Sequence, residues 1–295
     1  MEATLTFLGT GTSMGVPTLG CDCAVCTSAV SPDGDPHNRR TRPSIRLAYD
    51  GRTVLIDTGP DFHAQALREG IRRVDAVLYT HGHADHIMGF DDLRPLSFRG
   101  NDHLPVYADQ ETADNIERIF EYTFRKQDRY PTSARVNIHR IDPTPGAGIE
   151  LFGACFQRIP VTHGRQEITG YRFGSAAYLT DMSDIPDKSL PLLQDLDVLV
   201  LDALRQEPHP SHSHLDKSVA IVEQLKPRRA FFTHMSHDLD HDLIVVERLP
   251  GLFGRNEEIF RVLSDDRLHE GEAVPVMMND AHHGLAAVGL ADLPR

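Results

Sequence analysis

Residues 80–86 read Thr80-His81-Gly82-His83-Ala84-Asp85-His86, directly after the apolar run Ala76-Val77-Leu78-Tyr79. The apolar run predicts a buried strand, and a loop that leaves a strand can aim several side chains at one point. Imidazole and carboxylate groups are ligands of divalent transition metals. A pair of histidines occurs by chance on many exposed turns, but three histidines and an aspartate so close together after a strand are typical of a metal site. The stretch therefore predicts metal binding.

This loop offers more ligands than one tetrahedral ion uses while it keeps a position open for water. The surplus indicates two neighbouring ions. Other candidate ligands follow short apolar runs elsewhere in the chain, namely His163 after Val161-Thr162, Asp181 after Tyr178-Leu179-Thr180, and His234 after Phe231-Phe232-Thr233. Strands that end in this way can bring their last residues together at one sheet edge.

The rest of the chain interleaves strand and helix patterns. Alternation and apolar runs predict strands at 4–8, 44–49, 53–57, 76–79, 151–159, 168–173, 176–180, 197–202 and 229–233, and a short one at 273–277. Helical spacing predicts helices at about 61–69, 109–126, 215–225 and 240–248, with the aromatic residues at 120–124 in the core. Asp50-Gly51 predicts a tight hairpin turn. The layout favours an α/β fold of two packed sheets covered by helices, in one domain spanning 1–295, with a C-terminal extension at about 250–295 whose structure the sequence leaves open.

Three cysteines lie close together in the segment 20–27, at Cys21, Cys23 and Cys26. They are too close for a disulfide framework, and only Cys155 remains to pair with one of them. The spacing favours a structural zinc over free thiols, and His237, three residues after His234, is our candidate for the fourth ligand. Reduced cysteines and an N-terminus without a signal-peptide pattern lead us to expect a cytoplasmic protein.

The composition limits the partners. The formal net charge is −13, and no block of lysines and arginines forms a basic arm. This balance argues against a large nucleic-acid ligand, whose phosphates require a basic surface, but a small phosphorylated compound stays open. No apolar run is long enough to cross a bilayer, so we expect no membrane partner.

Taken together, these motifs resemble the metallo-β-lactamase superfamily, which has an αβ/βα four-layer sandwich and a dinuclear site along one sheet edge. The resemblance rests on Leu55-Ile56-Asp57-Thr58-Gly59, on residues 81–86, and on His163, Asp181 and His234. It implies that one ion is held by His81, His83 and His163, and the other by Asp85, His86 and His234. Asp181 would bridge the two ions. Asp57 would orient a ligand through a hydrogen bond.

A narrower resemblance concerns the phosphoribosyl 1,2-cyclic phosphate phosphodiesterase branch of this superfamily. It rests on Leu8-Gly9-Thr10-Gly11-Thr12, the cysteine motif and Thr233-His234-Met235-Ser236-His237. It implies a Cys3His structural zinc and two catalytic divalent ions, for which zinc and manganese both suit the ligands. The implied reaction is hydrolysis of a small phosphodiester, cyclic or open, by a metal-bridging hydroxide. The metal ligands Asp85 and Asp181 would be catalytic residues of this reaction.

The same branch carries one more histidine ahead of the last metal ligand, as general acid or phosphate contact. His212 and His214 are the candidates, and we prefer His212 because its separation from His234 agrees with the branch. Arg205 could grip a phosphate or form a surface ion pair. Residues 250–280 are longer than is usual in this branch, and His282 and His283, which stand where relatives show another turn, are expected at the surface.

Two other functions share these motifs. A tRNA 3′-processing endonuclease would need a basic arm, and none is visible at 98–135 or elsewhere. A non-catalytic carrier protein of cofactor biosynthesis would carry the cysteine zinc, but here all seven hydrolytic ligands are also present. Hydrolysis of a β-lactam or a thioester is a weaker alternative, because ligands alone do not set the substrate. A homodimer is compatible with each of these functions.

Overall fold

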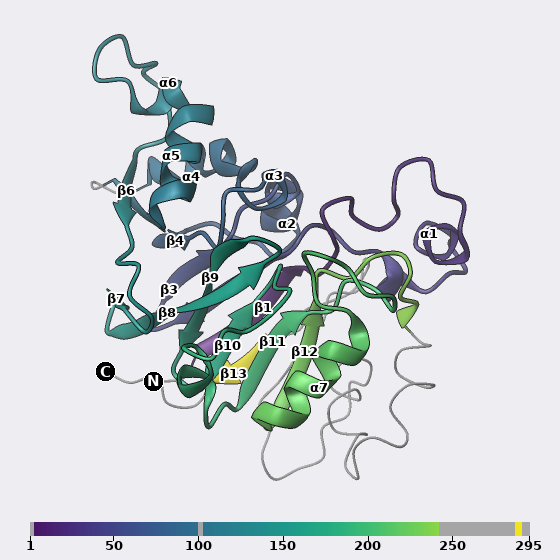
Figure 1. The fold of residues 1–295 in the computed structure, drawn as a ribbon. Coiled ribbons are helices and arrows are strands. Elements are labelled where there is room, and N and C mark those ends of the chain that lie inside the picture. The colour runs from purple at the N-terminus through teal and green to yellow at the C-terminus, as the bar shows by residue number, and fades with distance from the viewer. Residues whose placement is uncertain (1–2, 100–102, 242–286, 291–295) are drawn as a thin grey trace.

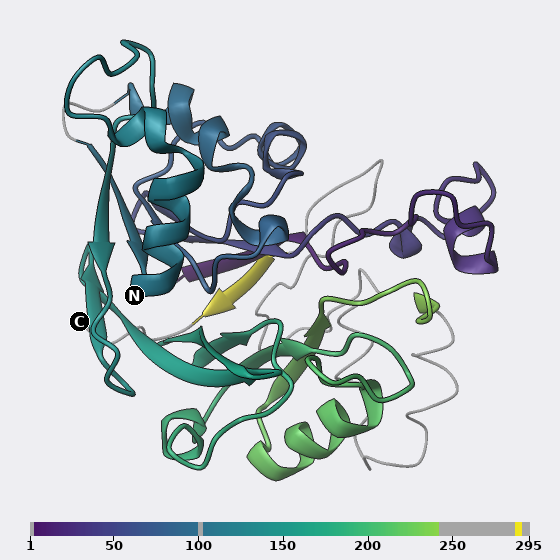
Figure 2. The ribbon, with the colours of Figure 1, turned by 45° about the horizontal axis from the view of Figure 1, so that its top comes forward.

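A computed structural model describes residues 3–99, 103–241 and 287–290 of the chain. Two mixed β-sheets pack face to face, and helices cover the outer face of each (Figure 1). Turned forward, the molecule shows the resulting four layers, with α5 and its neighbours above the first sheet and α7 below the second (Figure 2). The structure is thus the αβ/βα sandwich that the sequence predicts.

The described part of the first sheet has seven strands, in the order β13 (Ala287–Leu290), β1 (Ala3–Gly9), β2 (Ser44–Tyr49), β3 (Arg52–Ile56), β4 (Ala76–Leu78), β5 (Leu104–Ala108) and β6 (Val136–Arg140). The described part of the second sheet has six strands, in the order β12 (Arg229–Thr233), β11 (Val198–Asp202), β10 (Ala176–Leu179), β9 (Gln166–Phe173), β8 (Ala154–His163) and β7 (Gly148–Leu151).

The described α-helices are α1 (Ala24–Ser28), α2 (Phe62–Arg68), α3 (Ala84–Ile87), α4 (Arg94–Ser97), α5 (Gln110–Ile119), α6 (Glu121–Phe124) and α7 (Leu215–Leu225). Three short 3-10 helices accompany them, η1 (Pro36–Asn38), η2 (Phe90–Leu93) and η3 (Leu190–Leu193). No helix among the described residues has the length and apolar character needed to span a membrane.

Each interface between layers has its own apolar core. Between the sheets, Phe7, Phe156 and Phe231 are among the buried side chains. A second core joins the first sheet to the helices above it, and a third joins the second sheet to α7. Burial of one such aromatic side chain contributes about 1.5–3 kcal/mol to stability. The two sheets are also tied by hydrogen bonds, among them one of 2.7 Å from Tyr171 Oη to the carbonyl oxygen of Tyr79.

Strand direction decides where polar residues gather. Strands β3 to β6 run parallel to one another, as do β10 to β12. Strand β8 is antiparallel to β9, which is antiparallel to β10, so β8 runs with β10. The carboxyl ends of these strands therefore lie at common sheet edges, which is where ligand sites form in such folds.

Most of the expected elements are present, with three corrections. The helix expected at 109–126 is broken at Phe120, whose φ of −104° and ψ of 35° separate α5 from α6. The strand expected at 151–159 is a hairpin, β7 and β8, because Phe152 and Gly153 take positive φ angles of 53° and 86°. Strands β5, β6 and β13 were not expected from the sequence.

The predicted hairpin at Asp50-Gly51 is confirmed, with φ angles of 45° and 71° and with Tyr49 opposite Arg52. Most of the helix expected at 240–248, the strand expected at 273–277, and His282 and His283 lie outside the described residues. Of the C-terminal extension, the structure describes β13, which pairs antiparallel with β1.

Candidate metal centre

The ends of six strands supply the polar residues of one site. Asp57 follows β3, His81 comes shortly after β4, His163 ends β8, Asp181 comes shortly after β10, Asp202 ends β11 and His234 follows β12. Asp57, Asp181 and His234 have φ angles of 65°, 56° and 59°. These left-handed conformations are costly for residues with a Cβ, and such strain concentrates at functional sites. The backbone is thus held in a strained form at three of the residues that bear ligand groups.

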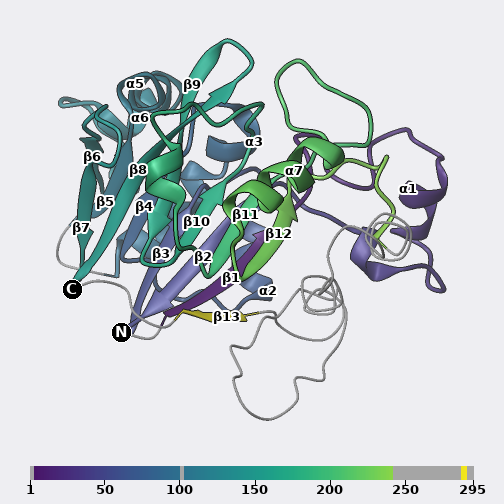
Figure 3. The same cartoon turned by 60° about the horizontal axis from the view of Figure 1, so that its bottom comes forward.

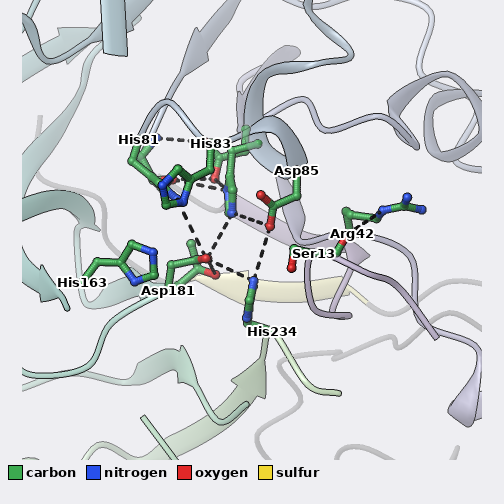
Figure 4. Close-up of polar contacts among 12 residues, drawn as sticks. Ser13, Arg42, His81, His83, Asp85, His163, Asp181 and His234 are labelled. Carbon is green, nitrogen blue, oxygen red and sulfur yellow. Dashed lines mark hydrogen bonds and ion pairs between the residues drawn. The ribbon is translucent and has the colours of Figure 1, made fainter. Parts of the chain in front are cut away.

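Three histidines form the first cluster. His81, His83 and His163 each offer a ring nitrogen, and these nitrogens lie within 4.8 Å of one another. His81 Nε2 is 2.9 Å from His83 Nδ1 (Figure 4). His163 donates from Nδ1 to the carbonyl oxygen of Ser211 at 2.7 Å, which leaves the lone pair on its Nε2. A hydrogen bond of this kind fixes the tautomer of a metal-binding histidine.

The second cluster consists of Asp85, His86, Asp181 and His234, and all four side chains are buried. Asp181 lies at its centre, with Oδ2 3.1 Å from His86 Nε2 and Oδ1 3.1 Å from His234 Nε2. The same Oδ1 is 3.9 Å from His81 Nε2 of the first cluster (Figure 4). Asp181 therefore lies between the two clusters, the position that a bridging carboxylate requires.

The close approach of α3 to the loop after β3 depends on glycine. A Cβ atom on Gly59 would lie 2.0 Å from the carbonyl oxygen of Asp85. The backbone N–H of Thr58 donates to the carbonyl oxygen of His86 at 2.8 Å, which ties the same two segments together. A side chain at residue 59 would push away the helix that carries two of the ligands.

The charge of this site fits divalent cations. Asp57, Asp85 and Asp181 are at most 8% exposed, and no described lysine or arginine forms an ion pair with any of them. Buried carboxylates without a cation are costly. Burial alone would raise the pKa of Asp85, but the charge of His86 and a hydrogen bond from His234 hold that pKa below its usual range.

One atom of His86 also lacks a partner that a bound cation would supply. Its Nε2 makes no hydrogen bond although it lies close to the oxygens of Asp85 and Asp181. Burial would lower the pKa of His86, and the surrounding carboxylates raise it well above its usual value. The oxygens and the ring nitrogen converge without hydrogen-bonding, as the donor set of an ion would.

Asp57 orients His86, as the sequence predicts. Its Oδ2 accepts from His86 Nδ1 at 2.8 Å and from the hydroxyl of Thr80 at 2.8 Å, and its Oδ1 accepts from the backbone N–H of Thr80 at 2.9 Å. Burial raises the pKa of Asp57, and these donors oppose that rise because they stabilise the carboxylate. With its proton held on Nδ1, His86 presents the lone pair of Nε2 to the cluster.

His212 lies beside both clusters. Its ring stacks on that of His234 at 4.6 Å between centroids and is 4.7 Å from the ring of His163. Its Nδ1 is 2.7 Å from Oδ2 of Asp202, which is fully buried and has no partner for Oδ1. Burial lowers the pKa of His212 to about 4 and raises the pKa of Asp202 well above its usual value.

Asp202 Oδ2 and His212 Nδ1 are close enough to share one proton in a hydrogen bond. With that proton between Asp202 Oδ2 and His212 Nδ1, the other ring nitrogen of His212 carries an N–H that can be donated. The sequence predicts a strand at 197–202, of which Asp202 is the last residue, and gives Asp202 no further role. The signal for a pairing with His212 was that this carboxylate stands at a strand end, ten residues before a candidate catalytic histidine.

His214 precedes α7 and belongs to none of the clusters. Arg205 forms no ion pair with the described residues. Its guanidinium donates to the carbonyl oxygens of Glu207 and Pro208 at 3.1 and 2.9 Å, so it braces the loop that leads to His212.

A third cluster lies apart from the sandwich, where the segment bearing α1 projects from the body (Figure 3). The sulfur atoms of Cys21, Cys23 and Cys26 lie 3.2, 3.8 and 3.3 Å from His237 Nδ1. Three sulfurs around one imidazole nitrogen match the donor set of structural zinc. Burial raises the pKa of the Cys26 thiol to about 11, a cost that a bound cation would offset.

The cysteine cluster joins two distant parts of the chain. The loop after β1 also pairs with the segment after β12, where Met235 N donates to Thr10 O at 2.9 Å and Thr12 N donates to Met235 O at 3.0 Å. Buried Arg40 donates to the carbonyl oxygens of Ser236 and Leu239 at 3.0 and 2.8 Å. His234 therefore lies in a segment held from both sides.

Comparison with known proteins places this geometry in a family. The family described as "Beta-lactamase superfamily domain" matches residues 52–235, more than half of the chain. The chain therefore belongs to the beta-lactamase superfamily, and its sandwich is the metallo-β-lactamase fold.

Among curated proteins, an octanoyltransferase of Porphyromonas gingivalis is 38% identical over 232 residues, which are 78% of this chain and 45% of that protein. The coenzyme PQQ synthesis protein B of Methylobacterium radiotolerans is 31% identical over 160 residues, 49% of this chain and 50% of that protein. The chain thus spans about half the length of the curated relatives it matches.

Among solved structures, a diphosphatase from the PhnP family is 56% identical, with a TM-score of 0.77 over 85% of this chain and 92% of that chain. Zinc-bound PqqB from Methylobacterium extorquens has a TM-score of 0.64 at 20% identity, over 83% of this chain and 95% of that one. The short form of human tRNase Z has a TM-score of 0.58 at 19% identity, over 79% of this chain and 93% of that one. The last two show the shared fold.

We expect Asp57→Asn to weaken metal binding at the buried clusters about 10–100-fold, because the hydrogen bond that orients His86 is lost or reversed. Metal titration of the purified variant measures this affinity. The cysteine cluster of the same protein is the internal control and should keep its ion. An unchanged affinity at the buried clusters would contradict the role given to Asp57.

We expect Cys26→Ser to remove one tightly bound zinc per chain and to lower the temperature of unfolding, because the segment bearing α1 loses its link to His237. Elemental analysis and thermal unfolding measure the two effects. Cys155→Ser is the matched control, since Cys155 lies outside the cluster. Equal zinc content in the two variants would show that the cysteines hold no ion.

Proposed function

We propose that this superfamily hydrolase cleaves a small phosphodiester, cyclic or open, with two divalent ions at the buried clusters. His81, His83 and His163 would hold one ion, Asp85, His86 and His234 the other, and Asp181 would bridge them. Bound ions would supply a water of lowered pKa as the nucleophile and positive charge for the phosphate oxygens. Both zinc and manganese suit these ligands.

One observation carries the proposal, the position of the His212–Asp202 pair beside the clusters. A ring nitrogen of His212 lies within 4.8 Å of ligand atoms of His163 and Asp181. A substrate phosphate held at the clusters would place its leaving oxygen within reach of this ring. His212 then donates its proton to the leaving oxygen, and Asp202 moves the shared proton onto Nδ1, so the imidazole is never left without one.

The nature of the leaving group decides how much this proton matters. An alcohol oxygen leaves as a strong base unless it is protonated, whereas a phosphate or nitrophenol oxygen leaves readily without help. A diester of an alcohol therefore uses the His212–Asp202 pair fully. A protein of known structure that is 56% identical is a diphosphatase, so cleavage of a diphosphate, with a phosphate as leaving group, is the second candidate for this site.

Two other functions have less support. The described surface carries no basic arm for tRNA, and the formal charge of −13 opposes a long nucleic acid. A non-catalytic carrier would not require the buried carboxylates and the His212–Asp202 pair, which are costly to bury without a chemical use. We also place the reaction in the cytoplasm, on the basis of the reduced cysteines.

The experiment that tests this proposal is a turnover panel with added manganese or zinc. The substrates are bis(p-nitrophenyl) phosphate, a cyclic ribose phosphate, a cyclic nucleotide, a dinucleoside diphosphate, a tRNA precursor and a β-lactam. We expect turnover of small diesters and none of the tRNA or the β-lactam. Absence of diester turnover with either metal would refute the proposal, and turnover of the diphosphate alone would favour the second candidate.

We expect His212→Ala to slow hydrolysis of an alkyl diester by roughly 10²–10⁴-fold, and to slow bis(p-nitrophenyl) phosphate far less, because only the first substrate needs a proton donor. Metal content should stay unchanged. His214→Ala is the matched control and should behave as the unmodified protein. If His212→Ala loses an ion, His212 is a ligand and its assignment as the proton donor fails.

A further inference from the structure

A cavity lies at the amino ends of β3, β4 and β5, whereas the metal clusters lie at the carboxyl ends of the strands. Its volume is about 730 Å³. Strand β3 begins at Arg52 in this cavity and ends next to Asp57 of the metal centre. The residues just before β4 and β5 also line it, since parallel strands begin at a common edge.

Arginine dominates the charge of this cavity. Four arginines line it, Arg52, Arg72, Arg73 and Arg99, and Asp75 is the one carboxylate among its described lining residues. We call the four residues the arginine pocket. With both of its histidines neutral, the lining has a net charge of +3. The whole chain has a formal charge of −13, so acidic residues are abundant but are not placed here.

Asp75 fixes two of the four guanidinium groups. It is buried, and its Oδ1 accepts from Arg52 Nη1 at 3.0 Å and from Arg73 Nε at 2.9 Å. Its Oδ2 accepts from the backbone N–H of Thr53 at 2.9 Å, which anchors the carboxylate. Arg52 also lies over the ring of Phe152, 4.7 Å from its centroid. Two positive groups are therefore held in place around one negative charge.

The other two arginines have no such partner. Among the described residues, the side chains of Arg72 and Arg99 form no hydrogen bond or ion pair, and both are exposed. Like charges that gather in one cavity repel one another, which costs stability unless an anion binds among them. Guanidinium groups bind phosphate oxygens through two parallel hydrogen bonds, and all four cations here are arginines.

The size and the walls of the cavity define the ligand further. A volume of about 730 Å³ lies within the range of small-molecule sites and is too small for a folded partner. A net charge of +3 matches a compound with at least two phosphate groups. The rings of Phe152 and His139 also line the cavity and are exposed. Arg52 covers one face of Phe152 and Tyr107 stacks on one face of His139, so a flat ring system would pack against the other face of either ring.

We propose that the arginine pocket binds a small organic polyphosphate of the nucleoside triphosphate class, at a site separate from the metal clusters. The phosphates would lie among the four arginines and the base near Phe152 and His139. This proposal does not depend on the reaction at the metal centre.

Calorimetric titration of the full-length, metal-loaded protein with ATP, inorganic triphosphate and AMP tests the proposal. We expect ATP to bind more tightly than inorganic triphosphate, and AMP to bind weakly. The double variant Arg72→Ala, Arg99→Ala should raise the Kd for ATP by roughly tenfold or more, since each arginine contributes charge-assisted hydrogen bonds. The control Arg39→Ala, Arg125→Ala removes the same net charge at exposed positions outside the pocket, and its Kd should stay close to that of the unmodified protein.

Several results would overturn the proposal. One is the absence of ATP binding at millimolar concentration. Another is an equal Kd for ATP in the two double variants, which would indicate that ATP binds at the metal centre. Inorganic triphosphate that binds as tightly as ATP would refute the nucleoside part. Turnover of bis(p-nitrophenyl) phosphate without ATP should be the same in both double variants and shows that they are folded.

Discussion

Buried negative charge at the carboxyl edge of the sandwich is the constraint on which the rest of this structure depends. Asp57, Asp85 and Asp181 are buried together, and without a cation their repulsion and desolvation would oppose folding. Divalent ions would attract these carboxylates, so that burial of the three charges would favour folding instead of opposing it. Metal binding at this edge would therefore favour folding, and ligand bonds to Asp181 and His234 would offset the cost of their strained φ angles.

A site of this kind needs both sheets at fixed positions. The first sheet supplies the 81–86 loop and the second supplies Asp181 and His234, so a small shift between the sheets would separate the ligands. The aromatic core between the sheets and the hydrogen bond from Tyr171 to Tyr79 resist such a shift. The cysteine cluster acts on His234 from outside, because His237 is only three residues away. Its structural role is thus to hold one ligand of the other site.

The sequence predicted those parts of the fold and site whose signal is local. Residues 81–86 are neighbours in the chain, and His163, Asp181 and His234 each follow an apolar run that shows where a strand ends. The break of the expected helix at Phe120 was not visible, because the apolar spacing continues across it. Strand β6 was missed because only Val136 of its five residues is buried, which leaves no clear alternation. Asp202 was missed although its place at a strand end ahead of His212 gave a signal. The arginine pocket could not be predicted, since its residues come together only through the order of the strands.

The same strand order explains why one domain can hold two sites of opposite charge. Parallel strands gather their carboxyl ends at one edge and their amino ends at the other, and β3 runs from Arg52 to the residue before Asp57. Five residues of extended chain separate the two edges, which is roughly 17 Å at about 3.3 Å per residue. The two sites are therefore separate in space, and an anion among the arginines would not occupy the place of a phosphate at the metal centre. Strands β3 and β4 connect the two sites, because the ends of these strands carry residues of both.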